Sequence, residues 1–145
     1  MDPINLEIDG KQIEVEKGAT ILEAAQEAGI YIPHLCYHPD LAPFGACRLC
    51  VVEVKGMKGF LSSCTTPATE GMVVRTKTPE VQELRKNILE LILTEHPASC
   101  LTCSKNLNCE LQRVAQYIDL DKLSLPYIHK EFPIKENPLF IRVYN

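Results

Sequence analysis

Apolar and polar residues alternate at the start of the chain, as they do in a half-buried β-strand. Residues 4–8 read Ile-Asn-Leu-Glu-Ile, and residues 13–15 read Ile-Glu-Val. Asp9 and Gly10 lie between these two stretches. This pair suits a type I′ turn, because both central residues of that turn have positive φ. The pattern therefore predicts a β-hairpin.

A short helix and further strands are predicted after the hairpin. Thr20 precedes an apolar run and Glu23 follows three residues later, which is the capping-box pattern of a helix start; Gly29 marks the stop. Residues 51–54 and 72–76 are rich in valine and predict two more strands. Such a set of elements indicates a small mixed sheet that grips one helix, as in β-grasp ferredoxins.

From residue 79 onward the apolar residues recur with the period of a helix. Thr78 can cap this helix, Pro79 fits its first position, and Glu80 lies near the positive end of the helix dipole. The expected apolar face contains Val81, Leu84, Ile88 and Leu91, widened by Leu89, Ile92 and Leu93. Pro97 ends the helix just after His96, and residues 110–115 predict a second helix.

The last part of the chain, residues 119–145, has neither period. Its prolines prevent a long helix, yet it is too apolar for a disordered tail. Its large apolar residues are Leu125, Tyr127, Ile128, Phe132, Ile134, Leu139, Phe140, Ile141 and Tyr144. We expect an extended tail that docks on a partner; a tail folded back on residues 1–118 is the alternative.

Composition and charge narrow the class of protein. A chain of 145 residues supports one domain, or a small domain with an appendage. Its net charge of −4 argues against nucleic acid or an anionic membrane as the partner. The N-terminus shows no signal-peptide pattern, and the longest near-apolar run, residues 88–93, is too short to span a membrane. These features predict a cytoplasmic protein.

Seven cysteines and one histidine form two sets of four candidate ligands. The first set has the spacing C-x10-C-x2-C-x13-C and consists of Cys36, Cys47, Cys50 and Cys64. The second set has the spacing H-x3-C-x2-C-x5-C and consists of His96, Cys100, Cys103 and Cys109. A reducing compartment favours metal ligands over disulfides, and disulfides would leave one thiol unpaired. Iron–sulfur clusters take four protein ligands, mostly thiolates, so the count predicts two clusters.

The first set indicates a [2Fe–2S] cluster. Each iron takes two protein sulfurs, and Cys47 and Cys50 are close enough in sequence to serve one site. Ten residues separate Cys36 from this C-x2-C pair, whereas four residues separate the first cysteine from the pair in the plant-type pattern. The site is therefore of a different type. Gly45 and Ala46 should let backbone N–H groups approach the sulfurs. Zinc is the alternative, although the spacing fits no usual zinc ribbon.

The second set indicates a [4Fe–4S] cluster. Its three cysteines lack a fourth ligand unless His96 supplies it. A neutral imidazole in place of a thiolate removes one negative charge, which favours the reduced cluster. The other histidines, His34, His38 and His129, are expected on the surface or beside the ligands. The sequence contains no nucleotide-binding or hydrolase motif, so we expect no catalytic site in this chain.

The ligand-bearing segments closely resemble the N-terminal region shared by the large iron–sulfur subunit of respiratory complex I, [FeFe]-hydrogenases and NAD-linked formate dehydrogenases. The match spans residues 4 to about 118 and is carried by residues 32–38, 45–53, 64–67, 70–72, 96–103 and 109–112. The resemblance implies that the first set holds a [2Fe–2S] cluster and that the second set holds a histidine-ligated [4Fe–4S] cluster.

The chain also departs from these relatives. In longer members, a segment like residues 137–142 leads into a ferredoxin-like domain with two further [4Fe–4S] clusters, whereas this chain stops at Asn145. We expect a short dedicated subunit; the truncated N-terminal part of a longer catalytic chain is the alternative.

These expectations describe an α+β protein in three parts. They are a β-grasp, ferredoxin-like [2Fe–2S] domain at 1–78, a small helical [4Fe–4S] domain with one histidine and three cysteine ligands at 79–118, and the docking tail at 119–145. The resemblance implies an electron-transfer subunit of a cytoplasmic, NAD(P)-linked hydrogenase or formate dehydrogenase complex. In that hetero-oligomer it would relay electrons between a flavin- and NAD-binding subunit and a partner redox module. A free-standing two-cluster ferredoxin and a zinc-stabilised interaction module are the alternatives.

Overall fold

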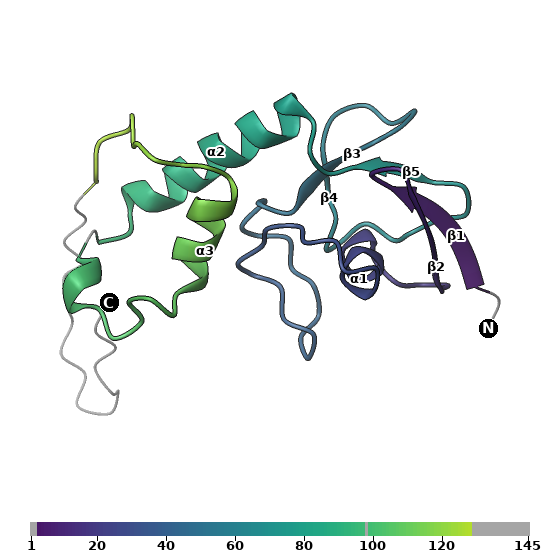
Figure 1. The fold of residues 1–145 in the computed structure, drawn as a ribbon, viewed down its shortest axis with the longest axis horizontal. Helices are drawn as coiled ribbons and strands as arrows, with labels where there is room; N and C mark the ends of the chain where they lie inside the picture. The colour runs from purple at the N-terminus through teal and green to yellow at the C-terminus, as the bar shows by residue number, and fades with distance from the viewer. Residues whose placement is uncertain (1–2, 98, 129–145) are drawn as a thin grey trace.

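The computed structural model describes residues 3–97 and 99–128 and has an α+β fold, as predicted (Figure 1). A mixed sheet and one short helix form one part, and two longer helices form the other. The elements are β1 (Pro3–Ile8), β2 (Lys11–Glu16), α1 (Ile21–Glu27), β3 (Val51–Val54), β4 (Leu61–Ser62), β5 (Val73–Arg75), α2 (Pro79–Thr94), the 3-10 turn η1 (Cys100–Thr102) and α3 (Glu110–Tyr117).

The five strands form one sheet in the order β2-β1-β5-β3-β4. β1 and β5 run parallel, and the other neighbours run antiparallel. The predicted hairpin of β1 and β2 is confirmed, and both residues of its turn have positive φ, 51° at Asp9 and 84° at Gly10. Strand β4 has only two residues, too few for an alternating pattern to reveal it.

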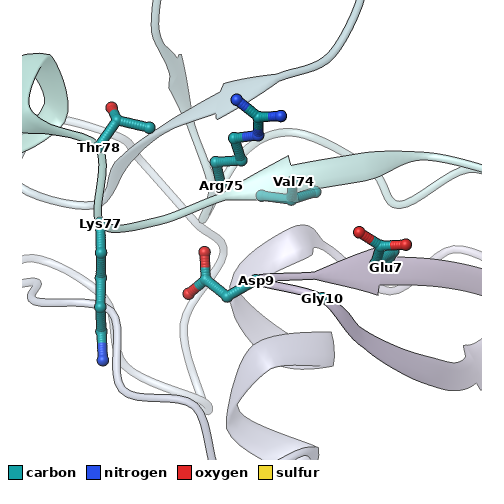
Figure 2. A pocket seen from close by; sticks show the side chains of 7 residues that line it. All are labelled: Glu7, Asp9, Gly10, Val74, Arg75, Lys77 and Thr78. Carbon is teal, nitrogen blue, oxygen red and sulfur yellow. The ribbon is translucent and has the colours of Figure 1, made fainter.

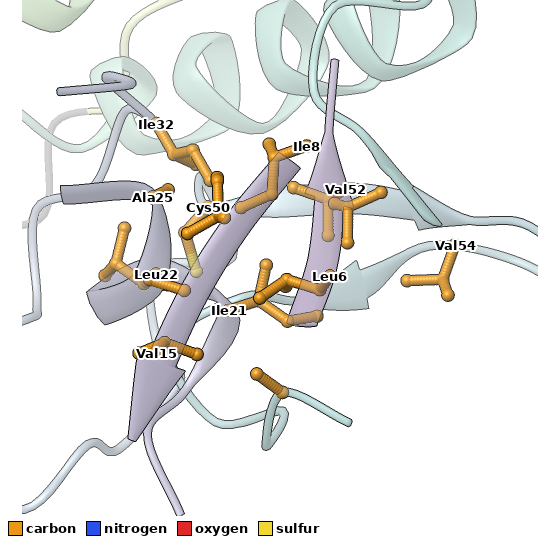
Figure 3. Close-up of a cluster of buried hydrophobic side chains, with 14 of the residues drawn as sticks. Leu6, Ile8, Val15, Ile21, Leu22, Ala25, Ile32, Cys50, Val52 and Val54 are labelled. Atoms are coloured by element: carbon orange, nitrogen blue, oxygen red, sulfur yellow. The ribbon is translucent and has the colours of Figure 1, made fainter. Parts of the chain in front are cut away.

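Helix α1 packs one side of its surface against this sheet. The predicted capping box is present: the Glu23 N–H donates to Thr20 Oγ1 at 3.2 Å, and the Thr20 N–H donates to Glu23 Oε2 at 2.7 Å. Four of the seven helix residues are buried, Ile21, Leu22, Ala24 and Ala25. Figure 3 shows Cys50 among the apolar side chains of this core, which places a candidate ligand in its interior.

Helix α2 begins where predicted, and its buried face contains part of the predicted apolar face together with three polar residues. The Val81 N–H donates to Thr78 Oγ1 at 3.3 Å, which confirms the cap. The helix ends at Thr94, two residues before the expected end at His96. The buried positions are Val81, Arg85, Leu89, Glu90 and Thr94, whereas Leu91 of the predicted apolar face is 60% exposed. The periodicity of apolar residues found Val81 and Leu89 but could not reveal the buried polar residues, of which Arg85 lies between them.

A second, smaller core joins the helices to the first part of the molecule. Its buried residues are Leu49, Leu89, Val114 and Ile118. Leu49 comes from the loop before β3, and Leu35 and Cys47 from the same loop pack against this core. The two parts predicted as separate domains therefore share a hydrophobic core, and a candidate ligand packs against it.

The chain after α3 turns back along α2. The Ser124 hydroxyl donates to both carboxylate oxygens of Glu90, and the Ser124 and Leu125 N–H groups donate to Glu90 Oε1. The Ile128 N–H donates to the Thr94 carbonyl oxygen at 2.6 Å. For residues 124–128 these contacts favour the alternative of a tail folded back on its own chain. Residues 129–145 lie outside the described residues, so their docking stays a prediction.

Candidate metal centres

The first set of cysteines comes together in the loops that border β3 and β4. Cys36 and Cys47 lie on the irregular segment after α1, Cys50 immediately precedes β3, and Cys64 follows β4. The Cys47 N–H donates to Cys36 Sγ at 3.4 Å, and the sulfurs of Cys50 and Cys64 are 3.4 Å apart. All four are free thiols. The structure thus brings the set together as two pairs.

Backbone N–H groups point at the Cys36 sulfur, as the small residues before Cys47 predicted. Burial opposes ionisation of Cys36, but hydrogen bonds from the N–H and the thiol of Cys47 and from the N–H of Ala46 together lower the pKa of Cys36. Gly45 makes this approach possible: its φ is +67°, and an added Cβ would lie 3.0 Å from Thr65 Cγ2. The loop is therefore shaped to stabilise a thiolate at Cys36.

Two thiols of the first set, Cys47 and Cys64, resist ionisation. Burial raises the pKa of Cys47. Burial, together with the neighbouring sulfurs of Cys50, Cys36 and Cys47, raises the pKa of Cys64 to about 12. Four adjacent thiolates need a cation to offset their repulsion, and a metal-bound thiol is deprotonated outright. The donor set therefore fits a cationic iron–sulfide core.

The grouping into pairs bears on the choice between iron and zinc. A zinc ion would draw four sulfurs around one point, each at about 2.3 Å from the metal. Among residues 3–97 and 99–128, no three His, Cys, Asp or Glu side chains are arranged to hold a single metal ion. Two irons that each take two protein sulfurs need such pairs, so the grouping of the first set is compatible with a [2Fe–2S] core.

The second set lies on one exposed loop between α2 and α3. The His96 N–H donates to the Leu93 carbonyl oxygen at 3.3 Å, just beyond the end of α2. Cys100 opens η1, and the Cys103 N–H donates to its carbonyl oxygen at 3.1 Å. Cys109 is the residue immediately before α3. Sequence and structure agree that this set occupies the turn between two helices.

The four side chains of the second set make no hydrogen bond with one another in the described structure. His96, Cys100 and Cys103 are exposed, and Cys109 is half-buried. A [4Fe–4S] core has four irons and four protein ligands, so the ligands stand apart around the core and need no mutual contact. The arrangement is compatible with such a core.

Gln112 braces this loop, a role that the sequence pattern did not reveal. Its amide nitrogen donates to Asn106 Oδ1 at 3.0 Å, and its carbonyl oxygen accepts from the Leu107 N–H at 3.1 Å. Leu107 has a φ of +65°, which costs energy for a branched residue. The side chain on α3 thus fixes the turn between Cys103 and Cys109.

The remaining histidines do not join either set in the described structure. His34 Nδ1 lies 2.8 Å from the Ile32 carbonyl oxygen. His38 is exposed and accepts from the Asp40 N–H at 3.2 Å. Both positions agree with the expectation of surface or supporting roles. His129 lies outside the described residues.

A surface pocket lies at the end of β1 and β5, away from both ligand sets. Figure 2 shows its lining residues, Glu7, Asp9, Gly10, Val74, Arg75, Lys77 and Thr78. None of them is a candidate ligand or a nucleophile with an adjacent base. The two ligand sets remain the candidate sites of this chain.

Both ligand sets lie within regions of the chain that match iron–sulfur family models. Residues 1–79 match the family described as a 2Fe-2S iron-sulfur cluster binding domain. The chain belongs to this family. Residues 85–123 match the NADH-ubiquinone oxidoreductase-G iron-sulfur binding region. The chain is therefore an iron–sulfur electron-transfer region with one [2Fe–2S] and one [4Fe–4S] cluster, as predicted.

Its relatives are much longer proteins. An NADH-quinone oxidoreductase subunit of Rhizobium meliloti is 45% identical over 109 residues, which are 75% of this chain and 13% of the relative. NADP-reducing hydrogenase subunit HndD of Solidesulfovibrio fructosivorans is 44% identical over 121 residues, which are 80% of this chain and 21% of the relative. The family predicted from the ligand motifs is confirmed.

A solved structure has the same fold. It is the crystal structure of an NAD+-reducing [NiFe]-hydrogenase in the H2-reduced state, with a TM-score of 0.83 and 35% identity. The match covers 90% of this chain and 55% of that chain. Among the described residues of the present chain, every helix is too short or too polar to cross a lipid bilayer.

Proposed function

We propose that this chain relays electrons within a complex, between a flavin- and NAD-binding subunit and a partner redox module of hydrogenase, formate dehydrogenase or similar type. The observation that carries the proposal is the second core. Cys47 of the first ligand set packs against a core formed largely by α2 and α3, the helices that border the second set. Because the helices that border the second set form this core, both ligand sets belong to one packed unit, which favours electron transfer between their cofactors.

The first ligand set would hold the [2Fe–2S] cluster. Its contacts favour Cys36 and Cys47 on one iron and Cys50 and Cys64 on the other, so that the C-x2-C pair is divided between the two irons. The cluster supplies one-electron chemistry when bound. The chain contributes N–H donors at Cys36 and an apolar enclosure at Cys50, and both influence the reduction potential.

His96, Cys100, Cys103 and Cys109 would hold the [4Fe–4S] cluster. The motivation is the division of the eight ligands into two sets of four and the position of this set on one loop between two helices. This loop is far more exposed than the first site. The exposure fits the cluster that exchanges electrons with another protein.

We propose the same division of the chain into parts, with boundaries at 78/79 and 118/119, because each of the first two parts contains one ligand set. Residues from both sides of the first boundary contribute to the second core. Partner binding is proposed for the tail beyond residue 128. The proposed compartment is the cytoplasm, where the seven thiols stay reduced and available to iron.

Metal analysis tests the cofactor content of the proposal. Anaerobically purified protein should contain iron and acid-labile sulfide at about six of each per chain, the sum of one [2Fe–2S] and one [4Fe–4S] cluster. Zinc without sulfide, or a colourless protein, would overturn the proposal in favour of a zinc-stabilised module.

Substitution of His96 tests the second ligand set. His96→Ala should weaken or abolish the [4Fe–4S] signal in electron paramagnetic resonance and leave the [2Fe–2S] signal intact. His96→Cys should restore a four-thiolate cluster with one more negative charge and a lower potential. An unchanged [4Fe–4S] spectrum and potential in His96→Ala would show that the fourth ligand lies elsewhere.

A further inference from the structure

Arg85 on α2 is a fully buried cation, with 0% of its surface exposed. Its guanidinium donates to three backbone carbonyl oxygens. These are Leu49 O at 3.2 Å from Nε, Thr76 O at 2.9 Å from Nη1 and Val51 O at 2.7 Å from Nη2. Arginine is almost never fully buried without a partner of opposite charge, because desolvation of a charged group is costly. A negative charge near Arg85 would therefore stabilise the cation in this buried position.

Protein carboxylates do not supply that charge directly. Among the residues that the structure describes, no Asp or Glu lies within ion-pair distance of Arg85. The Asp9 carboxylate is linked to it only through Thr76, whose N–H and hydroxyl donate to Asp9 while its carbonyl oxygen accepts from Arg85. Carbonyl dipoles orient toward the guanidinium but carry no net charge.

The carbonyl groups that Arg85 binds place it beside a ligand of the first set. Leu49 and Val51 are the sequence neighbours of Cys50 on both sides, so the guanidinium spans the backbone that carries this ligand. Cys50 is itself 1% exposed. Burial lowers the pKa of Arg85 to about 10, and the nearby Tyr117, Cys50 and Asp9 oppose this shift. The cation and the thiol share one water-poor environment.

We propose that Arg85 is a positioning residue that fixes the backbone around Cys50 and whose buried charge raises the reduction potential of the [2Fe–2S] cluster. The inference rests on the proposed assignment of the first ligand set to that cluster. An iron–sulfide core bound by four thiolates is anionic, and reduction adds one more negative charge. A nearby cation therefore stabilises the reduced cluster more than the oxidised cluster. Salt screens this interaction little, because Arg85 does not contact solvent.

Redox titration followed by electron paramagnetic resonance tests this role on the full, cluster-containing chain. Arg85→Met removes the charge and keeps a long side chain, while Arg85→Lys keeps a charge and loses the three-way hydrogen bonding. Lys86→Met is the matched control, because it removes a cation from the next residue of α2, which is not fully buried. The [4Fe–4S] potential of each variant is the internal control.

In Arg85→Met the electron affinity of the [2Fe–2S] cluster should fall at least tenfold, which is about 59 mV for a one-electron couple. Arg85→Lys and Lys86→Met should stay near the wild-type [2Fe–2S] potential, and no variant should move the [4Fe–4S] potential. If Arg85→Met does not retain the cluster, a near-wild-type potential in Arg85→Lys supports the role of the charge, and a lowered potential there overturns it.

The proposal is also overturned by an unchanged potential in cluster-bearing Arg85→Met, by an equal shift in Lys86→Met, or by loss of the [2Fe–2S] signal in both Arg85 variants. The last result would show that the residue serves only the fold. A wild-type protein without a [2Fe–2S] signal would instead refute the proposed function, and the role of Arg85 would fall with it.

Discussion

Leu49 offers a direct test of the idea that one hydrophobic core joins the two cluster-binding parts. It lies between Cys47 and Cys50, yet its side chain is fully buried against α2 and α3 rather than in the core of the sheet. Leu49→Ala removes three carbon atoms from a core with only four buried members among the described residues. The small size of this core leaves few neighbours that could close the resulting cavity.

The magnitude follows from the burial of the leucine. At about 0.8 kcal/mol per buried carbon, the loss of transfer free energy is about 2.4 kcal/mol. The cavity that remains raises the cost, and buried Leu→Ala changes fall at about 2.7–5 kcal/mol. With a urea dependence of about 2 kcal/mol per M, a loss of about 3 kcal/mol lowers the unfolding midpoint by about 1.5 M.

Urea unfolding of anaerobic, cluster-containing protein provides the assay. Circular dichroism should follow the helices, and visible absorption should follow the clusters. Leu41→Ala is the matched control, because Leu41 lies on the same loop and is 67% exposed. Its free energy of unfolding should change by no more than about 0.5 kcal/mol. Because Leu49 serves both parts, the helical signal and the cluster absorption should decline at the same lowered urea concentration.

Two results would refute this reasoning. A change below about 1 kcal/mol in Leu49→Ala would show that the site collapses without cost or that Leu49 is not buried in solution. Loss of the [2Fe–2S] absorption at a lowered midpoint while the helices keep the wild-type midpoint would show that the two parts unfold independently. In either case the shared core would not be the basis of their coupling.

Two further substitutions probe the loop and the tail. Gly45→Ala should lower the occupancy of the [2Fe–2S] cluster, and it should lower the free energy of unfolding by about 1–2 kcal/mol or more, because it combines positive φ with a contact at Thr65. The control is Gly59→Ala, which also has positive φ but open space around it, and it should lower stability without changing cluster occupancy. Equal losses of occupancy in the two variants would contradict this reasoning. Glu90→Gln should release residues 124–128 from α2, measured as faster amide hydrogen exchange. The side-chain hydrogen bond from Ser124 lowers the pKa of Glu90, so the attachment should be complete above the ordinary value of 4.5 and lost as pH falls through the lowered pKa. The quantity to follow is the protection of residues 124–128, which is the intrinsic exchange rate at each pH divided by the observed rate. Protection that stays constant through this pH range would contradict the role of this carboxylate.

Local rules predicted much of this protein from its sequence alone. The turn at Asp9 and Gly10, the capping box of α1 and the cap of α2 depend on residues within three positions of one another, so their physical chemistry is legible in the sequence. The number and type of candidate ligands are also legible without a fold, because seven cysteines and one histidine divide into two sets of four. That is why the two types of cluster could be predicted.

The tertiary structure decided what depends on distant contacts. Arg85 has the sequence appearance of a surface residue on an amphipathic helix, and only the carbonyl groups of Leu49, Val51 and Thr76 make its burial possible. These partners lie 36, 34 and 9 residues away. The sequence also did not predict which core buries Leu49, because a loop residue between two ligands belongs to no periodic pattern. Burial is a property of the assembled chain, and no pattern within a helix or a loop specifies what will cover it.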